Sequence, residues 1–359
     1  MSDGTPTARR ARLEPLLAAA RSLLDAASER GALARTRLVA STGLSPQGVD
    51  FALRRCLEAN PSEDELLALL AATPEVPRAN VLLSANVFVA AHRAIAIALA
   101  ASERVFVRPS RREPALAELL WEATPGSFQL RSELELEPGD HLWAYGSDQT
   151  LAEIARSTPQ AVTLHAHGSG FGLAVLGNAR VSATDLERSL LGLAEDVTLF
   201  DQRGCLSPRV LLVAGDPGRA LELARELATI LAHLELCIPR GRLSSEEAAE
   251  LTLYRDSASY AGELFSAGLG FVSVSPSEQF ILPPVGRNLH ILATENPLAL
   301  IANLAPFVTS CAVEGDPALR AALQHALPCA RSSRFGTMQR PPFDGPVDRR
   351  EWSPRVLPT

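Results

Sequence analysis

Apolar residues recur at helical spacing in the first part of the chain. Leu13 and Leu16 begin one such series, and Ser62 with Glu65 has the spacing of a capping box in front of another. The spacing is typical of helices that bury one face. The pattern therefore predicts a helical N-terminal segment over residues 1–77.

From Val81 onward, short apolar runs alternate with amphipathic stretches. This alternation is typical of a parallel sheet covered by helices. Strands are expected at 81–84, 104–107 and 141–145, and helices at 87–101, 114–123 and 148–155. Residues 78–168 are thus predicted to form a first α/β lobe.

A second α/β lobe is predicted over residues 169–330, after a turn at His165–Gly172. Helices are expected at 185–193 and 220–236, and strands at 270–274, 289–293 and 309–313. Residues 331–359 form a proline-rich C-terminal segment, which either docks on a lobe or stays loose. The predicted fold class is α/β with two lobes.

Composition narrows the classes of function. All 34 basic residues are arginine, and the formal net charge is −7. Non-specific binding to nucleic acid needs a basic face, so nucleic acid is not an expected partner. The stretch Ser41–Val49 has the form of a helix-turn-helix turn, but the acidic balance favours a packing role for it. Because lysine is absent, a lysine Schiff base and a P-loop lysine are excluded.

The five cysteines contain no CxxC pair, and no N-terminal apolar segment resembles a secretory signal. The apolar run Ala94–Ala101 is far shorter than the roughly 20 residues needed to cross a bilayer. We therefore expect a cytoplasmic protein without a transmembrane segment, a disulfide framework or a metal site, and its assembly into a homo-oligomer is left open.

One cysteine has an unusual setting. Cys205 follows Gly204 in the polar stretch DQRGCLSPR, directly before an apolar run. Arg203 and Arg209 are close in sequence, and cationic neighbours favour the thiolate, which is the nucleophilic form. Cys205 is therefore the candidate nucleophile, with a small residue that fills a loop as the alternative.

Three other cysteines lie within apolar stripes, which is typical of buried structural thiols. These are Cys56, Cys237 and Cys311.

Polar residues follow two of the expected strands of the first lobe. Arg108, Ser110 and Arg111 come at the end of one strand, and Gly146 with Ser147 joins another strand to a helix. Ligands of open α/β sheets bind at the carboxyl ends of strands, and helix starts favour phosphate. Guanidinium groups there suit a ribose 2′-phosphate, which favours NADPH over NADH. A solvated charge cluster and a turn needed only for geometry are the alternatives.

Several short motifs occur in the order found in the aldehyde dehydrogenase superfamily, which the chain resembles: Ser84–Phe88, Val105–Ser110, Tyr145–Ser147, Val162–His165 and Gly204–Cys205. Within that superfamily, DQRGCLSPR and Leu282–Asn288 resemble the acyl-CoA reductase family typified by LuxC-type fatty acyl reductases. The resemblance implies an aldehyde-dehydrogenase-like fold with two Rossmann-like lobes. One lobe binds the cofactor, and the other carries the cysteine loop.

The resemblance also implies roles for single residues. Cys205 matches the catalytic nucleophile. Asn86 matches the amide that forms an oxyanion hole with the backbone N–H of the cysteine. Arg108 stands where a lysine bonds the cofactor ribose, and Ser147 matches a serine on the cofactor pyrophosphate.

One position departs from oxidising aldehyde dehydrogenases. Where those enzymes carry a glutamate that activates water, this chain reads Leu164-His165-Ala-His167-Gly168. Without that glutamate, the thioester intermediate on the cysteine should hydrolyse slowly, so it could accept hydride instead. His165 or His167 is a candidate proton donor, and packing is the alternative for each.

The resemblance therefore implies NADPH-dependent reduction of an acyl-CoA thioester, fatty or otherwise, or of a carrier-bound one. Two alternatives stay open: an acyl-transfer relay that uses Cys205 without reduction, and a non-catalytic partner of a fatty-acid or polyketide-type system.

Overall fold

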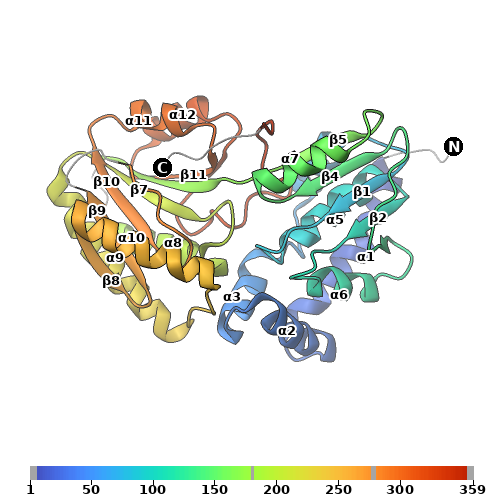
Figure 1. Cartoon of the computed structure of the whole chain (residues 1–359), viewed down its shortest axis with the longest axis horizontal. Coiled ribbons are helices and arrows are strands. Elements are labelled where there is room, and N and C mark those ends of the chain that lie inside the picture. Colours follow the sequence, from blue (N-terminus) through green and yellow to red (C-terminus); the bar gives the residue numbers. More distant parts are fainter. Residues whose placement is uncertain (1–5, 179–181, 276–279, 354–359) are drawn as a thin grey trace. The chain divides into compact units, whose positions relative to one another are not determined.

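The computed structural model describes residues 6–178, 182–275 and 280–353, which form two compact units. The first unit extends to Ser169 and takes in Pro342–Val347 and residues 351–353. The second extends from Gly170 to Pro341 and takes in Asp348–Arg350. Each unit is built around its own β-sheet (Figure 1).

Four helices begin the first unit: α1 (Pro6–Leu24), α2 (Glu29–Thr42), α3 (Pro46–Cys56) and α4 (Glu63–Ala72). Ser28, Ser45 and Ser62 cap the last three by accepting a hydrogen bond from a backbone N–H of the first turn. Ser62 and Glu65 form the predicted capping box. Helix α1 packs on α5 (Ala90–Ala101), so this helical segment belongs to the same compact unit as the first sheet.

The first sheet has the order β3-β2-β1-β4-β5, and all its strands are parallel. They are β1 (Ala79–Leu82), β2 (Val105–Arg108), β3 (Gln129–Leu130), β4 (His141–Tyr145) and β5 (Thr163–His167). Helices α5, α6 (Ala115–Ala123) and α7 (Asp148–Ser157) connect them. The first strand starts two residues earlier than expected because the Ala79 N–H already bonds the Arg104 carbonyl.

The second sheet has the order β12-β11-β6-β7-β10-β9-β8, and only the pair β8–β9 is antiparallel among the described strands. Its strands are β6 (Phe171–Leu176), β7 (Pro208–Ala214), β8 (Glu263–Ala267), β9 (Gly270–Ser275), β10 (Leu289–Thr294), β11 (Val308–Glu314) and β12 (Arg331–Ser333). The strands expected at 270–274, 289–293 and 309–313 are confirmed to within one residue at each end.

Helices cover both faces of this sheet. They are α8 (Ala183–Thr198), the 3-10 turn η1 (Leu199–Gln202), α9 (Pro217–Cys237), α10 (Ser245–Ala261), α11 (Pro297–Leu304) and α12 (Pro317–Ala326). Leu190 of α8 and Leu227 of α9 lie in the apolar core of one face, and Ile301 of α11 and Leu323 of α12 lie in that of the other. The central strands of this sheet are thus packed on both faces.

The prediction of a turn at His165–Gly172 is wrong at both ends of that range. Strand β5 continues to His167, and β6 begins at Phe171 and is buried along its whole length. Its sequence, FGLAVL, is a short continuous apolar run, which is the pattern of a strand buried on both faces.

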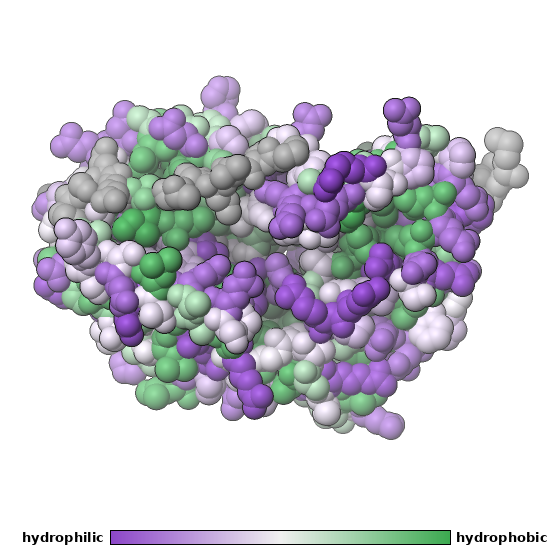
Figure 2. Space-filling model, viewed as in Figure 1, coloured by the Kyte–Doolittle hydropathy of each residue, from purple (hydrophilic) through white to green (hydrophobic). Residues whose placement is uncertain are grey.

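Every helix in the described part of the chain is too short or too polar to cross a membrane. On the face shown in Figure 2, apolar side chains are interspersed with polar ones, as is usual on a globular surface.

Candidate functional site

Predicted cofactor-binding and catalytic residues share one edge of the first sheet. Asn86 lies in the loop after β1, Arg108 ends β2, Ser147 follows β4 and His167 ends β5. Because these strands are parallel, their carboxyl ends meet at one edge. The strand order reverses between β1 and β4, which is where open α/β sheets bind ligands.

The loop after β2 carries three guanidinium groups. Arg108 is half-buried, whereas Arg111 and Arg112 are exposed. Ser110 Oγ accepts a hydrogen bond from the Arg112 N–H at 3.3 Å, which shapes the turn. Within the described residues, none of the three arginine side chains has a hydrogen bond or an ion pair. They therefore fit an anionic ligand group.

The start of α7 is less open than the sequence suggests. Ser147 Oγ accepts a hydrogen bond from the Thr150 N–H at 3.2 Å and so caps the helix. Asp148 adds a carboxylate to the first turn, where it accepts hydrogen bonds from Trp352 Nε1 and the Ser169 N–H. Gly146 donates its N–H to the His167 carbonyl at 3.3 Å. A second negative charge is disfavoured beside Asp148, so the arginine loop suits a phosphate better.

Asn86 is exposed in the loop between β1 and α5. Its carboxamide has no hydrogen-bond partner in the part of the chain that the structure describes. Cys205 belongs to the other unit, so a shared oxyanion hole stays a prediction.

The two candidate histidines differ in their surroundings although both lie on β5. His165 Nε2 is 2.9 Å from His141 Nδ1, and its ring stacks on Trp143 at 4.5 Å between centroids. Burial lowers the pKa of His165 to about 4, with His141 adding to that effect. His167 stacks on Tyr145 at 4.8 Å and lies at the carboxyl end of the strand. His165 is therefore neutral near pH 7 and lacks the imidazolium proton that a general acid transfers.

Cys205 lies in a tight turn, as predicted. The Ser207 N–H donates to the Gly204 carbonyl at 3.0 Å, and Cys205 stands between them just before β7. The Gly172 N–H of β6 donates to the Ser207 carbonyl at 2.8 Å, and Gln339 Nε2 donates to Ser207 Oγ at 2.7 Å. The turn is thus fixed to the amino ends of two neighbouring strands.

The expectation that Arg203 and Arg209 favour the thiolate is wrong. Arg203 pairs with Glu247 at 2.7 Å, and Arg209 donates to the Pro283 carbonyl. Both guanidinium groups are therefore engaged elsewhere, and burial raises the pKa of Cys205 to about 12.

Two charged residues that sequence reasoning missed act on this thiol. Asp348 raises the pKa of Cys205 further, and Arg350 lowers it. They form an ion pair with each other at 2.8 Å and are distant from Cys205 in sequence. Arg350 also donates to the Pro306 carbonyl at 2.9 Å. No local pattern indicates such a contact.

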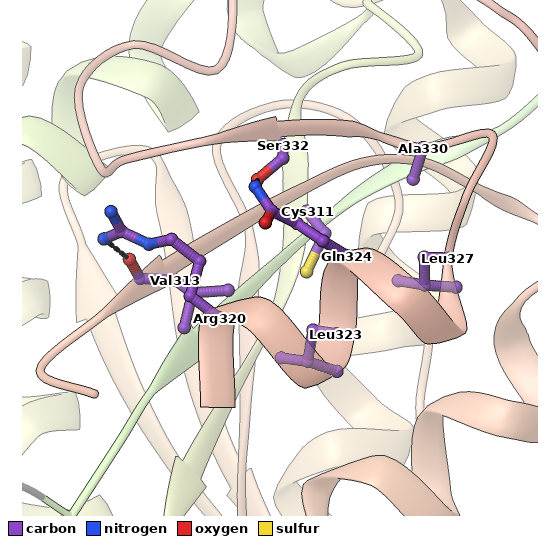
Figure 3. Close-up of a pocket in the computed structure, with 8 residues that line it drawn as sticks. All are labelled: Cys311, Val313, Arg320, Leu323, Gln324, Leu327, Ala330 and Ser332. Carbon is purple, nitrogen blue, oxygen red and sulfur yellow. Dashed lines mark hydrogen bonds between the residues drawn. The ribbon is translucent and has the colours of Figure 1, made fainter. Parts of the chain in front are cut away.

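The other cysteines divide differently from the prediction. Cys56 and Cys311 are buried as expected, but Cys237 is exposed because it is the last residue of α9. Cys311 lines a cavity of about 10 Å³ under α12, together with Val313, Arg320, Leu323, Gln324, Leu327, Ala330 and Ser332 (Figure 3). That volume holds about one water molecule and excludes an acyl substrate.

Across the described residues, no cluster of His, Cys, Asp and Glu could hold a metal ion.

Residues 125–339 match the family model of acyl-CoA reductase (LuxC). The long-chain acyl-protein thioester reductase of Aliivibrio fischeri is 24% identical over 172 residues, 47% of this chain and 34% of that protein. Long-chain acyl-protein thioester reductase 2 of Photobacterium leiognathi is 22% identical over 173 residues, with the same coverage. The match thus spans about a third of the length of these curated relatives.

Solved structures of similar fold include an oxidoreductase from Marinobacter aquaeolei, with a TM-score of 0.71 and 13% identity over 93% of this chain and 78% of that one. An NAD-dependent benzaldehyde dehydrogenase from Corynebacterium glutamicum has a TM-score of 0.68 and 16% identity over 93% of this chain and 82% of that one. These likenesses confirm the predicted aldehyde-dehydrogenase-like α/β fold. Because the family match takes in more than half of the chain, the protein belongs to the acyl-CoA reductase (LuxC) family.

Proposed function

We propose that this protein reduces an acyl thioester to the aldehyde, with NADPH as reductant and Cys205 as the carrier of the acyl group. The observation that supports this most directly is the Cys205 turn. It holds one thiol at the amino ends of β6 and β7, in a chain that belongs to the acyl-CoA reductase family. A fatty acyl-CoA is the first substrate to test, and an acyl group carried on a protein is the second.

Acyl transfer begins with the Cys205 sulfur. It attacks the thioester carbonyl, a new carbon–sulfur bond forms to Cys205, and the bond to the departing thiol breaks. The Cys205 proton leaves on that thiol, so the exchange is neutral in protons overall. Because the thiol is held largely protonated, transfer of its proton is part of the step rather than a preceding equilibrium.

Negative charge grows on the carbonyl oxygen in this step and again during reduction. The Asn86 carboxamide and the Cys205 backbone N–H are the donors that we assign to it. Such a donor is worth roughly 3 kcal/mol of barrier. The Asn86 amide is exposed and has no hydrogen-bond partner among the described residues, which supports its part of this assignment.

The reductant belongs at the carboxyl edge of the first sheet. Arg108, Ser110 and Arg111 would hold a ribose 2′-phosphate, since these guanidinium groups lack partners in the described residues, and the Gly146–Ser147 turn would lie along the rest of the nucleotide. When bound, a reduced nicotinamide supplies the hydride that converts the acyl carbonyl to the aldehyde level.

After reduction, the oxygen takes up a proton. When the bond to Cys205 then breaks, the oxygen loses that proton as the carbonyl re-forms and the sulfur gains one, which releases the aldehyde and restores the thiol. Between the two histidines, we assign this proton to His167, because His165 is neutral near pH 7. The absence of a glutamate from Leu164–Gly168 supports reduction over hydrolysis of the acyl-enzyme.

The test follows NADPH absorbance with purified protein and a panel of acyl-CoA thioesters, beside Cys205→Ala. Cys237→Ala is the matched control, since it removes an exposed thiol from the same unit. Thioester-dependent oxidation of NADPH that disappears only in Cys205→Ala supports the proposal.

Two results contradict it. Acylation of Cys205 without NADPH oxidation would indicate an acyl-transfer relay. No acylation by any thioester, free or protein-bound, would indicate a non-catalytic partner.

A further inference from the structure

The motif Leu282–Asn288 has no role in the chemistry described so far. In the structure, its backbone and side chains contact residues on both sides of Cys205. The Gly286 N–H donates to the Asp201 carbonyl at 3.0 Å, and the Pro283 carbonyl accepts from Arg209 Nε at 2.7 Å. The two sequence motifs thus meet in space.

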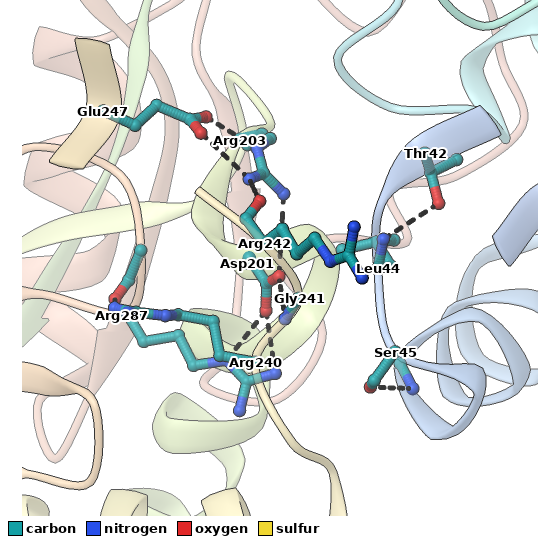
Figure 4. Close-up of polar contacts among 12 residues, drawn as sticks. Thr42, Leu44, Ser45, Asp201, Arg203, Arg240, Gly241, Arg242, Glu247 and Arg287 are labelled. Carbon is teal, nitrogen blue, oxygen red and sulfur yellow. Dashed lines mark hydrogen bonds and ion pairs between the residues drawn. The ribbon is translucent and has the colours of Figure 1, made fainter. Parts of the chain in front are cut away.

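A buried ion pair joins them (Figure 4). Arg287 Nε donates to Asp201 Oδ1 at 2.9 Å, and Nη2 lies 2.8 Å from the same oxygen in an ion pair. The two residues are only 2% and 1% exposed. The Gly241 N–H donates to the other carboxylate oxygen at 2.8 Å. Arg287 Nη1 also pairs with Glu235 at 3.0 Å. The carboxylate is therefore held from two directions.

A pair of amide side chains lies beside the ion pair. Gln202 Oε1 accepts from the Asn288 N–H at 2.8 Å, while its Nε2 donates to the carbonyls of Asn288 and Pro208. Asn288 is fixed in turn, because its Oδ1 accepts from the Phe271 N–H at 2.9 Å and its Nδ2 donates to the Val285 carbonyl at 3.0 Å. Gln202 thus connects the start of β7 with the residue before β10.

The backbone between these contacts is strained. Phe200, Asp201 and Gln202 have φ of 55°, 50° and 68°. Three consecutive non-glycine residues in the left-handed region are unfavourable and persist only where the surroundings fix them. The run redirects the chain from the end of α8 into the Cys205 turn.

We infer that the Asp201–Arg287 and Gln202–Asn288 pairs are positioning residues, which hold the left-handed run so that its following turn presents the Cys205 thiol to the thioester. The inference rests on the proposed function in taking Cys205 as the nucleophile. It gives the motif Leu282–Asn288 a role: it orients the nucleophile and does not touch the substrate.

The test compares Asp201→Asn and Gln202→Met with wild type. Asparagine keeps the shape of Asp201 and tolerates the left-handed region, so this variant removes the charge and one of the two accepting oxygens without changing the size of the side chain. Methionine fills the space of Gln202 without its hydrogen bonds. Asp216→Asn is the matched control, because Asp216 caps α9 after the opposite end of β7.

We expect kcat for thioester reduction to fall about 10- to 100-fold in both variants, with KM for NADPH unchanged, because small displacements of a reacting group are costly. The rate at which iodoacetamide alkylates Cys205, measured by mass spectrometry, should change by a similar factor. The exposed Cys237 and Cys329 report reagent activity in the same sample. Thermal midpoints define a temperature at which every variant is folded.

Wild-type kcat and alkylation rate in folded Asp201→Asn and Gln202→Met would overturn the inference. If Gln202→Met does not fold, Arg287→Lys replaces it, and full activity in that variant together with Asp201→Asn counts equally against the inference. If wild type itself reduces no thioester, the proposed function fails, yet Cys205 alkylation in the same variants still decides whether the pairs position the thiol.

Discussion

The two units fix their candidate residues in opposite ways. In the first, Arg108 ends a strand while Asn86 and Arg111 lie in the loops that follow strands, and the side chains of all three lack polar partners among the described residues. In the second, Cys205 follows buried groups such as Asp201 and Gln202, which are bonded on several sides. Unpaired donors keep their hydrogen bonds for a ligand, whereas paired ones fix a geometry. We therefore interpret the first unit as the part that exchanges a ligand and the second as the part that holds a thiol.

The largest effect should come from the first unit. Asn86→Ala removes the assigned oxyanion donor, and kcat should fall about 100-fold or more, as for other such donors. Binding of NADPH, followed by fluorescence titration, should change little. Gln129→Ala is the control, since it removes a carboxamide from β3 of the same unit. Near-normal turnover in Asn86→Ala would remove this residue from the mechanism.

The next effect concerns cofactor choice. Arg111→Ala should raise KM for NADPH about tenfold and leave KM for NADH nearly unchanged, because a guanidinium contact with the 2′-phosphate is lost. Arg104→Ala provides the control, as Arg104 is exposed at the opposite edge of the same sheet. An equal loss with both cofactors would mean that the loop does not distinguish them.

A smaller effect should follow from the charges beside the thiol. Asp348→Asn removes a negative charge that disfavours the thiolate, so the pKa of Cys205 should fall and alkylation at pH 8 should become several-fold faster. Arg350→Met removes the opposing positive charge, so the pKa should rise and alkylation should slow. The pH–rate profile of Cys205 alkylation measures both. Shifts in the same direction in the two variants would contradict the electrostatic account.

The same contrast explains what the sequence can reveal. The strand His141–Tyr145 and the start of α7 coincide with the prediction, because periodicity and a serine cap are local signals. The Cys205 turn was also predicted, since Gly204 and the polar residues around it mark a turn. The charges around the thiol could not be predicted. Arg203 and Arg209, which are near Cys205 in sequence, bond other groups, and the charged residues that act on the thiol come from the far end of the chain.

Backbone strain is equally hidden from sequence. Phe200 and Gln202 are not residue types that favour the left-handed region, so nothing local predicts their conformation. It follows from contacts with the loop before β10, which lies far away in sequence.

The smallest effect on turnover should come from His165, and it separates the two histidines. In the unfolded chain an imidazole titrates near 6.5, whereas burial lowers the pKa of His165 in the fold to about 4. Between these values the unfolded chain binds more protons, so His165 should make the protein less stable as pH falls from about 6.5 to 4. His165→Gln should therefore weaken the fall of the thermal midpoint between pH 7 and pH 5. Above pH 6.5, kcat should stay within about twofold of wild type, because the neutral ring carries no imidazolium proton to transfer there. His167→Gln, which should lower kcat across that range, is its counterpart on the same strand. If instead His165→Gln lost turnover at pH 8 as fully as His167→Gln, the proton would have to pass through His165, and the distinction between a packed and a working histidine on β5 would be wrong.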